Sequence, residues 1–519
     1  MFSFYNSVNN SCKGENCMRK YYLDNIRWLV GVLVVIYHLF YMYNAQGISG
    51  GLGPITDQKT QFFDLFIYIV YPWLMPILFI VSGISSRYYL DNHSNKEFIR
   101  NRTGKLLVPS TIGLFVFHFI QGYVSMRLTG GWQDIQSLPL FIKYLIMVLS
   151  GIGVLWYMQM LWLLCIILVL IRKIEKDRLW SIGTKVNLPI LFLAVFVIWL
   201  FAQIGNTPVI VVYRFGLYST MFFLGYFVFS HEEVIERLKK MWFIFTTASA
   251  VLCVFFCVTY FGKNIADAPI NRSPLFTAYC WFGSLAILGA SARYLDFENR
   301  LTRWMNRHSF GLYVFHYLGI SSVALLLGKQ RSLPAGWIYL ISLIAGFGSG
   351  YLLDAVISRI PFMRWAILGK VRVIEMFKDN LVQLRKMKSM TQEDIAEKVG
   401  VSRQSVAKWE SGESIPDLEK SRLLAKVLNV SLDELVNHET SDDMGFGVPP
   451  KGKYLFGIVT VGDKGQIVIP AKARKVFEIK TGDQLVILGD EAQGMAVIKA
   501  ENFLNMADAI RKSMENKQG

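Results

Sequence analysis

The sequence predicts a polytopic α-helical membrane domain of about ten spans, followed by an all-α helix-turn-helix domain and a small, mainly-β domain. Of 519 residues, 53% are hydrophobic and 18% are charged, whereas soluble domains are typically about 25% charged. Apolar runs of bilayer length recur up to about residue 360 and then stop. Residues 1–374 carry 33 basic and 16 acidic side chains, and residues 375–519 carry 21 and 22. The basic excess therefore belongs to the hydrophobic part and indicates membrane topology rather than a nucleic-acid surface.

Ten apolar runs are long enough, at about 20 residues, to cross a bilayer. They are 28–44, 62–84, 106–126, 144–171, 187–203, 209–229, 242–261, 275–292, 309–327 and 336–358. The fourth is long, as in a tilted span with an interfacial lead-in. The loops alternate in charge, with 17 Lys and Arg in one set and 7 in the other. The positive-inside rule then predicts a multi-pass plasma-membrane protein with both termini in the cytoplasm.

The cysteines and the N-terminal residues predict neither a metal site nor a cleavable signal peptide. Four of the six cysteines lie in apolar runs, where packing is their usual role. Cys12 and Cys17 lie in a polar tail without a further Cys/His cluster, so we expect no metal site there. The first 20 residues lack the apolar core of a cleavable signal peptide.

Ionisable residues inside membrane spans are costly and therefore candidates for function, although an interhelical hydrogen bond is the alternative for each. The candidates are His38, His118, Arg214, His316 and Asp354. His38 has the most support. It follows Arg27 by 11 residues, so both project from one helical face about 16 Å apart along the axis, and Asp24 shares that face. A cation at the cytoplasmic interface below an imidazole near mid-bilayer is suited to group transfer across a membrane.

An ordered set of short strings carries a family resemblance. Residues 23–27 read Leu-Asp-Asn-Ile-Arg and are followed, after ten residues, by His38. The other strings are Phe-Ile-Val-Ser-Gly at 79–83, the basic run Arg100, Arg102 and Lys105 before Pro109, Gly-Val-Leu-Trp-Tyr at 153–157 and Ser-Phe-Gly-Leu-Tyr-Val-Phe-His at 309–316. Together they resemble the membrane acyltransferase type 3 family over residues 19–370.

The resemblance implies an acyl-CoA donor in the cytosol, a hydroxyl acceptor such as a glycan on the far side, and no bound cofactor. His38 would be the general base for the acceptor hydroxyl, or would carry the acyl group briefly as an acyl-imidazole. The further catalytic candidates are Arg27, Asp24, Ser82 and His316, and the donor-binding candidates are Arg100, Arg102, Lys105, Trp156 and Arg214. Close helix packing is an equal alternative for Ser82 and its neighbour Gly83.

Residues 376–437 read as five short helices. Thr391 and Asp394 form a capping box, Gly400 allows a tight turn, and Ser402 opens the next helix. A helix, a turn at Gly and a second helix is the helix-turn-helix unit. The strings at 391–396 and 402–412 resemble the Xre, or Cro/phage-repressor, family.

That resemblance implies that the helix beginning at Ser402 enters the major groove of duplex DNA. Arg403 could bridge guanine and Gln404 adenine, with a solvated surface as the alternative. Gln392 and Lys408 would contact phosphate. The core of this domain would include Ile395, Val406 and Trp409.

After a linker at 438–456, residues 457–461 and 467–469 alternate like strands around a turn at 462–465, before a short helix near 471–477 and a strand at 484–488. Residues 463–470 and 482–483 resemble the AbrB/SpoVT swapped-hairpin fold. The resemblance implies an intertwined homodimer through residues 457–500, with Lys464, Lys472, Arg474 and Lys475 as phosphate contacts. Residues 501–519 form a C-terminal tail, amphipathic and helical over 501–517.

The sequence thus predicts a membrane O-acyltransferase at 1–370, in contact with lipid, fused to a cytoplasmic DNA-binding transcription regulator at 376–437. Two alternatives stay open. The membrane half could be a non-catalytic sensor that tethers the regulator, or the junction could be a fusion without functional coupling.

Overall fold

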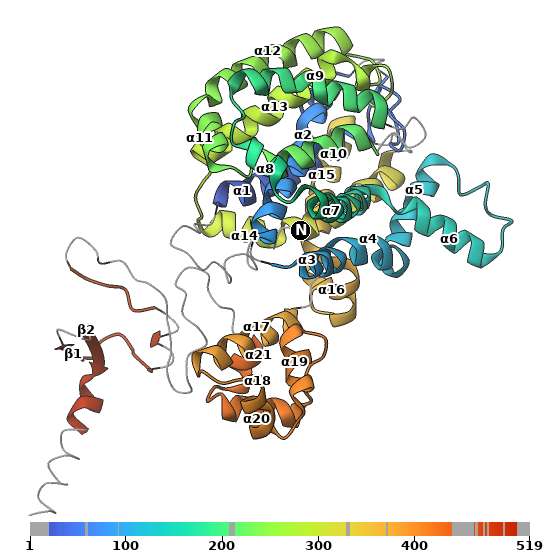
Figure 1. The fold of residues 1–519 in the computed structure, drawn as a ribbon. Coiled ribbons are helices and arrows are strands. Elements are labelled where there is room, and N and C mark those ends of the chain that lie inside the picture. The colour runs from blue at the N-terminus through green and yellow to red at the C-terminus, as the bar shows by residue number, and fades with distance from the viewer. Residues whose placement is uncertain are drawn as a thin grey trace, which may run out of the picture. The chain divides into compact units, whose positions relative to one another are not determined.

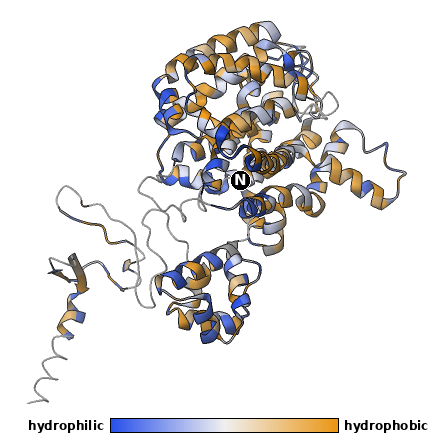
Figure 2. Cartoon of the chain, in the orientation of Figure 1, coloured by the Kyte–Doolittle hydropathy of each residue, from blue (hydrophilic) through white to orange (hydrophobic). Residues whose placement is uncertain are grey.

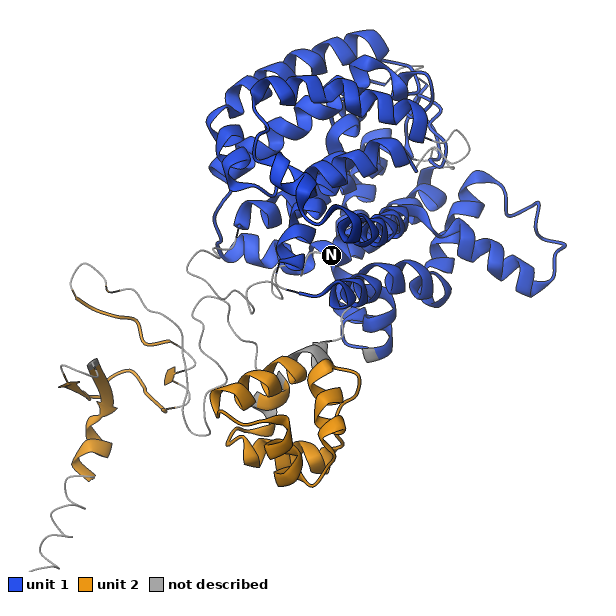
Figure 3. Ribbon diagram, in the orientation of Figure 1, with its two compact units in different colours: residues 1–371 blue, residues 372–519 orange. Residues whose placement is uncertain are grey.

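The structure, a computed structural model, divides into two compact units, Met1–Val371 and Arg372–Gly519 (Figure 3). It describes residues 20–57, 61–91, 93–206, 213–328, 333–369, 372–437, 461, 465–470, 473–474, 477–490 and 494–505. The predicted linker at 438–456, and Lys464, Lys472 and Lys475, lie outside these residues.

The described part of the first unit is built from helices and connecting loops (Figure 1). In chain order they are α1 (Tyr21–Met42), η3 (Phe62–Asp64), α2 (Leu65–Leu90), α3 (Asn95–Arg102), η4 (Thr103–Leu107), α4 (Val108–Gly113), η5 (Leu114–His118), α5 (Phe119–Thr129), α6 (Leu140–Ser150), η6 (Gly153–Leu155), α7 (Trp156–Glu175), α8 (Arg178–Gly183), α9 (Leu188–Gly205), α10 (Phe215–Phe227), α11 (Glu232–Lys240), α12 (Trp242–Tyr260), η7 (Ile270–Arg272), α13 (Pro274–Tyr294), α14 (Arg300–Val323), η8 (Ala324–Gly328), α15 (Ala335–Ile357) and α16 (Pro361–Leu368).

The ten predicted apolar runs all contain helices. Among the described residues, nine helical segments are long and apolar enough to cross a membrane. The run at 209–229 is the exception, because its described helix α10 has 13 residues, fewer than the roughly 20 that a span needs. The membrane fold predicted from hydropathy is therefore confirmed.

The run at 144–171 is not one tilted span but two helices, α6 and α7, separated at residues 151–155. Gly151 ends α6 where its backbone packs on the carbonyl of His118, at a place where a Cβ atom would lie 2.1 Å from that oxygen. Gly153 has a positive φ of 39°, a conformation that glycine tolerates best. These two glycines break the helix, and α6 packs beside α5 instead.

Helix α1 lies in the interior of the unit, packed against α2, α13, α14 and α15. Helices α9 and α12 are peripheral, because only 17% and 11% of the residues in their apolar stretches are buried. Figure 2 shows both helices as predominantly hydrophobic. Apolar side chains that face outward along a whole helix are typical of contact with lipid. Gly83 lets α2 approach α10, because a Cβ atom there would lie 2.1 Å from the carbonyl oxygen of Phe222. Close packing is therefore a demonstrated role for Gly83.

The second unit begins with five helices, in the number and order predicted. They are α17 (Arg372–Met387), α18 (Gln392–Val399), α19 (Arg403–Ser411), α20 (Leu418–Val427) and α21 (Leu432–Asn437). The capping box at Thr391 and Asp394 is present, and Gly400 ends α18 in the left-handed conformation. The predicted core residues Ile395, Val406 and Trp409 are buried together.

The described remainder of the second unit contains a two-stranded antiparallel sheet, β1 (Leu485–Asp490) and β2 (Gly494–Lys499), with Leu485 opposite Lys499. Strand β1 confirms the predicted strand at 484–488. The strand predicted at 467–469 is not seen, because these residues lie in no ladder among the described residues and Val468 is 77% exposed. Residues 457–460 of the other predicted strand lie outside the described residues. The helix predicted near 471–477 is seen at residues 473–474, and the tail is helical to residue 505.

Candidate active site and DNA-binding face

Arg27 is held rigidly inside the membrane unit. Its side chain is 4% exposed, its Nη1 donates to Asp24 Oδ1 at 2.6 Å, and its Nη2 donates to the hydroxyl of Ser85. Asp24 is buried too and lies one helical turn before Arg27 on α1. The carboxylate offsets part of the cost of burying the guanidinium. The two residues predicted to share one helical face thus form an ion pair, which the bond to Ser85 anchors to α2.

Arg27 opens onto a small cavity that brings α1, α2, α3 and α7 together. Its lining residues are Arg27, Ser82, Ser85, Ser86, Arg102, Leu161 and Cys165. Arg102 is buried, with its guanidinium 4.6 Å from the Phe98 ring. Two guanidinium groups around one cavity favour an anionic ligand. The hydroxyls of Ser85 and Ser86 already donate to the backbone carbonyls of Val81 and Ser82. The motif search missed Ser85 and Ser86, although their helical spacing from Ser82 could have revealed them.

The other residues predicted for this side are Ser82, Arg100 and Lys105, and of these Ser82 lines the cavity. Ser82 contacts the hydroxyl of Tyr157, with 3.1 Å between the two oxygens. Arg100 is exposed on α3 and Lys105 is half-buried in η4. Arg102 is therefore the member of the basic run that lines the cavity with Arg27.

His38 lies one turn before the end of α1, closer to that end than the mid-depth position expected from the sequence. It contacts His316 of α14, which is fully buried, with 2.9 Å between His38 Nδ1 and His316 Nε2. These residues are 278 positions apart in the chain. The structure thus joins two histidines that the sequence could only nominate separately.

The contacts of the pair determine a consistent set of tautomers. His316 Nδ1 lies 3.0 Å from the carbonyl oxygen of Leu312, which can only accept a hydrogen bond. A neutral His316 therefore carries its proton on Nδ1 and accepts at Nε2. His38 Nδ1 must then carry a proton, which it also directs at the Val34 carbonyl, 3.0 Å away. We assign the lone pair of neutral His38 to Nε2 on this basis.

Aromatic side chains surround the His38 imidazole. The rings of Tyr37, Tyr41 and Tyr317 lie 5.2, 5.8 and 5.2 Å from it, centroid to centroid. The Tyr317 hydroxyl donates to the carbonyl of Gly50, in the loop after α1. Aromatic faces beside a basic nitrogen provide an apolar surface against which a substrate can be oriented.

Arg214 and Trp156 are predicted as donor-binding residues, but the contacts of Arg214 lead to His38 rather than to Arg27. Arg214 donates to the Tyr71 hydroxyl, and Tyr71 stacks on Tyr37 at 5.8 Å. Trp156 packs edge-on against Tyr213, the residue before Arg214, at 6.0 Å. Neither side chain lines the Arg27–Arg102 cavity.

Two further ionisable residues have structural contacts. His308 Nδ1 lies 3.0 Å from Asp354 Oδ2 and links α14 to α15, which is the interhelical hydrogen bond considered as an alternative for Asp354. The ring of His118 is buried and stacks on Phe315 at 6.3 Å. Among the described residues, no cluster of three His, Cys, Asp or Glu could hold a metal ion.

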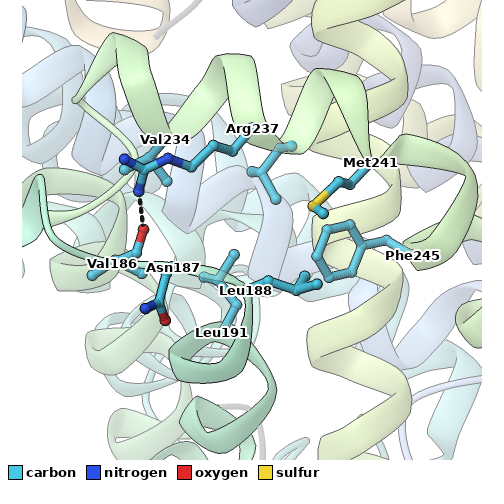
Figure 4. Close-up of a pocket in the computed structure, with 9 residues that line it drawn as sticks. Val186, Asn187, Leu188, Leu191, Val234, Arg237, Met241 and Phe245 are labelled. Carbon is cyan, nitrogen blue, oxygen red and sulfur yellow. Dashed lines mark hydrogen bonds between the residues drawn. The ribbon is translucent and has the colours of Figure 1, made fainter.

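A second cavity lies apart from these residues, between α9, α11 and α12 (Figure 4). Its walls are mainly apolar, and Leu191, Leu238 and Phe245 are buried in them. Arg237 donates to the backbone carbonyl of Val186 at 2.5 Å, which fixes α11 to the start of α9. We assign this cavity no part in the candidate active site.

In the second unit, helix α19 presents the predicted DNA-reading residues to solvent. Ser402, Arg403, Gln404 and Lys408 are all exposed. Arg403 forms an exposed ion pair with Glu393 of α18, 2.7 Å between Nε and Oε1. The exposed residue Arg474 is the one predicted phosphate contact of the C-terminal domain within the described residues.

Gln392 belongs to a network that sequence reasoning missed. Its Nε2 donates to Glu410 Oε2 at 2.8 Å, and Glu410 accepts two further bonds from Arg385, at 2.5 and 3.1 Å. This network fixes the start of α18 against α19 and α17. Bonding to Glu410 raises the pKa of Arg385, and bonds from Thr391 lower the pKa of Asp394.

Three protein-family models match the chain, one after another. A model described as an acyltransferase domain matches residues 20–355, well over half of the chain. The chain belongs to this acyltransferase family. A helix-turn-helix model matches residues 381–435, and the model of the antidote-toxin recognition protein MazE, a bacterial antitoxin, matches 458–502. The three families and their order confirm the predicted fusion, including its AbrB-like C-terminal part.

The curated relatives of this chain resemble its helix-turn-helix region. The HTH-type transcriptional activator BcrR of Enterococcus faecalis is 43% identical over 12% of the chain and 31% of BcrR. The cryptic phage CTXphi transcriptional repressor RstR of Vibrio cholerae is 36% identical over 13% of the chain and 59% of RstR. The HTH-type transcriptional regulator MJ0272 of Methanocaldococcus jannaschii is 34% identical over 12% of the chain and 98% of that protein.

The chain thus spans about a third of the length of BcrR and three fifths of RstR. No solved structure matches the chain.

Proposed function

We propose that the membrane unit transfers an acyl group from cytosolic acyl-CoA to a hydroxyl of an extracytoplasmic acceptor, a glycan in the first instance, and that the second unit is a sequence-specific DNA-binding transcription regulator. The observation that carries the proposal is the contact between His38 and His316 at 2.9 Å. His38 supplies a basic nitrogen, and Arg27, on the same helix α1, lines a separate cationic cavity.

The donor is proposed to bind at the Arg27–Arg102 cavity. The phosphates of CoA match two guanidinium groups and neighbouring hydroxyls, and the exposed Arg100 and half-buried Lys105 add positive charge nearby. The pantetheine arm of CoA is a long, flexible chain. It can carry the thioester along the roughly 16 Å that separate Arg27 from His38 on α1.

The lone pair on His38 Nε2 then accepts the proton of the acceptor hydroxyl. The hydroxyl oxygen attacks the thioester carbonyl, the carbon–sulfur bond breaks, and the CoA thiolate leaves and takes up the proton. In the alternative sequence, Nε2 attacks the thioester first, the carbon–sulfur bond breaks and CoA leaves as the thiolate. The acceptor hydroxyl then attacks the acyl-imidazole, the nitrogen–acyl bond breaks to restore Nε2, and the hydroxyl proton passes to the thiolate. In both, His316 accepts from His38 Nδ1 and holds the imidazole in place, which makes it a positioning residue.

Membranes containing the full chain, incubated with radiolabelled acetyl-CoA and a panel of glycans, test the proposed transfer directly. Label should appear in at least one glycan. Changing His316 to Leu should lower kcat by about 10- to 100-fold, the usual cost of removing an orienting partner, whereas His316→Gln should restore part of the rate because its amide oxygen can accept the same hydrogen bond. Equal losses in both variants would contradict the positioning role of His316.

Topology provides a separate test of sidedness. The 17-to-7 segregation of basic residues predicts that a reporter fused after Lys370 is cytoplasmic. The loop after α1, which contains Gly51, is predicted to be external, so a cysteine introduced at the exposed Ser49 of this loop should react with an impermeant maleimide added outside intact cells. A reporter at Lys370 that reads as external would place the DNA-binding unit on the wrong side of the membrane and end the proposal for that unit.

The C-terminal module is proposed to pair two chains, which would present two helix-turn-helix domains to two DNA half-sites. Apolar side chains on its described segments lack cover in one chain: Ile487, Met495 and Val468 are 66%, 83% and 77% exposed. Exposed apolar groups on so small a sheet favour burial against a second copy.

We therefore expect the fragment 376–519 to be a dimer by light scattering, and Met495→Glu to shift it toward monomer. Lys480→Glu, a charge change on an exposed polar residue of the same module, is the matched control. A fragment that is monomeric at micromolar concentration would contradict the dimer.

A further inference from the structure

Arg214 is a buried cation whose protein partners are all neutral. Its side chain is 3% exposed. It donates to the hydroxyl of Tyr71 and to the carbonyl of Ala266 at 3.2 Å, and its guanidinium carbon lies 4.8 Å from the Tyr71 ring and 5.3 Å from the Phe276 ring. Within the described residues, its buried Nε has no hydrogen-bond partner and no carboxylate forms an ion pair with it.

Two of the other buried arginines, Arg27 and Arg87, have a carboxylate partner. Arg27 pairs with Asp24 at 2.6 Å, and Arg87 pairs with Asp91 at 2.9 Å and Asp177 at 2.5 Å. The nearest acidic residue in sequence to the Ala266 contact is Asp267, which is exposed and accepts from Asn264 at 2.8 Å. Burying a cation without a countercharge costs several kcal/mol. A negative group supplied by a ligand would remove that cost.

The position of Arg214 indicates which substrate would supply this negative group. Tyr71 stacks on Tyr37 with 12° between the ring planes, and Tyr37 adjoins His38. Arg214 therefore lies on the His38 side, where the acceptor is proposed to bind. The printed contacts connect Arg214 to His38 through the Tyr71 and Tyr37 rings, so in this proposal Arg214 contacts a part of the acceptor away from the reacting carbonyl.

We propose that Arg214 binds an anionic group of the acceptor, a carboxylate or a phosphate, so that the acceptor is an anionic glycan rather than a neutral one. The planar guanidinium matches both groups through paired N–H donors. Its free Nε–H is one such donor. This inference rests on the proposed function, since it assigns specificity to the same site.

The test uses the full chain in lipid nanodiscs and three acceptors: an oligouronate, an oligo(glycerol phosphate) and a neutral glucan. For the preferred anionic acceptor, Arg214→Gln should raise KM by at least about tenfold with little change in kcat, while transfer to the neutral glucan stays at its low wild-type level. Arg127→Gln is the matched control, because Arg127 is an exposed cation of α5 bonded to Tyr123. The acceptor whose KM responds identifies carboxylate or phosphate.

Equal losses on all three acceptors, or a wild-type preference for the neutral glucan, would overturn the inference. If Arg214→Gln does not insert, Arg214→Lys keeps the charge but loses the paired donors, and its KM should rise by a smaller factor for the anionic acceptor alone. Direct binding separates this inference from the proposed function. In a His38→Ala background, which blocks transfer, the labelled anionic acceptor should still bind and should lose affinity on Arg214→Gln. Binding that does not depend on Arg214, in a chain that does transfer acyl groups, would refute the inference and leave the function intact.

Discussion

Replacing His38 by Ala should lower acyl transfer by about 10²- to 10⁴-fold, the usual contribution of a general base, without loss of membrane insertion. His38 is half-buried and its Nδ1 is committed to the His316 contact at 2.9 Å, so its Nε2 is the basic atom that the variant removes. The measurement is transfer of label from acyl-CoA in membranes, normalised to inserted protein by fluorescence-detected size exclusion.

Arg27→Ala should also lower acyl transfer strongly, but for a different reason. It leaves the Asp24 carboxylate buried without its partner at 2.6 Å and removes one of two cations from the cavity. Because Arg27 is assigned to the donor, Arg27→Ala should raise KM for acyl-CoA, whereas His38→Ala should lower kcat.

His93→Ala and Arg178→Ala are matched controls, because His93 lies between α2 and α3 and Arg178 in α8, and neither residue lines the cavity or belongs to the histidine pair. Near-normal turnover in well-inserted His38→Ala would refute the catalytic assignment and favour the alternative of a non-catalytic sensor.

Arg403→Ala should weaken binding at the preferred DNA site by about 1–3 kcal/mol and relax base preference at one position. Arg403 is exposed near the start of α19, where side chains of a recognition helix reach base edges. Its ion pair with Glu393 at 2.7 Å must open on binding, but an exposed pair of this kind costs at most about 1 kcal/mol to break. The measurement is fluorescence anisotropy with the fragment 376–519 and a selected duplex.

Lys408→Ala is the companion variant. It should weaken all duplexes about equally and flatten the salt dependence, as expected of a phosphate contact. Glu393→Gln should tighten binding, because it frees Arg403 and removes a negative charge beside DNA. If Arg403→Ala instead weakened every duplex uniformly, Arg403 would be a phosphate contact and the placement of the recognition helix would be wrong.

The helices of both units could be predicted because their signals are local. Apolar runs of bilayer length specify the membrane helices, and the Thr391–Asp394 capping box with Gly400 specifies α18 and its turn. The prediction failed where a tertiary contact decides. Gly151 breaks the fourth run against the carbonyl of His118. Residues 467–469 form no strand among the described residues.

The sequence by itself determined the membrane fold, the helix-turn-helix unit and the one-face relation of Arg27 and His38, because a regular helix fixes the positions of residues 11 apart. Only the tertiary structure decided which distant residues join them. It placed Arg102 beside Arg27 and His316 beside His38, and moved Arg214 from the predicted donor side to the His38 side. The physical reason is that helical periodicity orients side chains within a helix, whereas the contacts between helices depend on packing, and no local pattern records that packing.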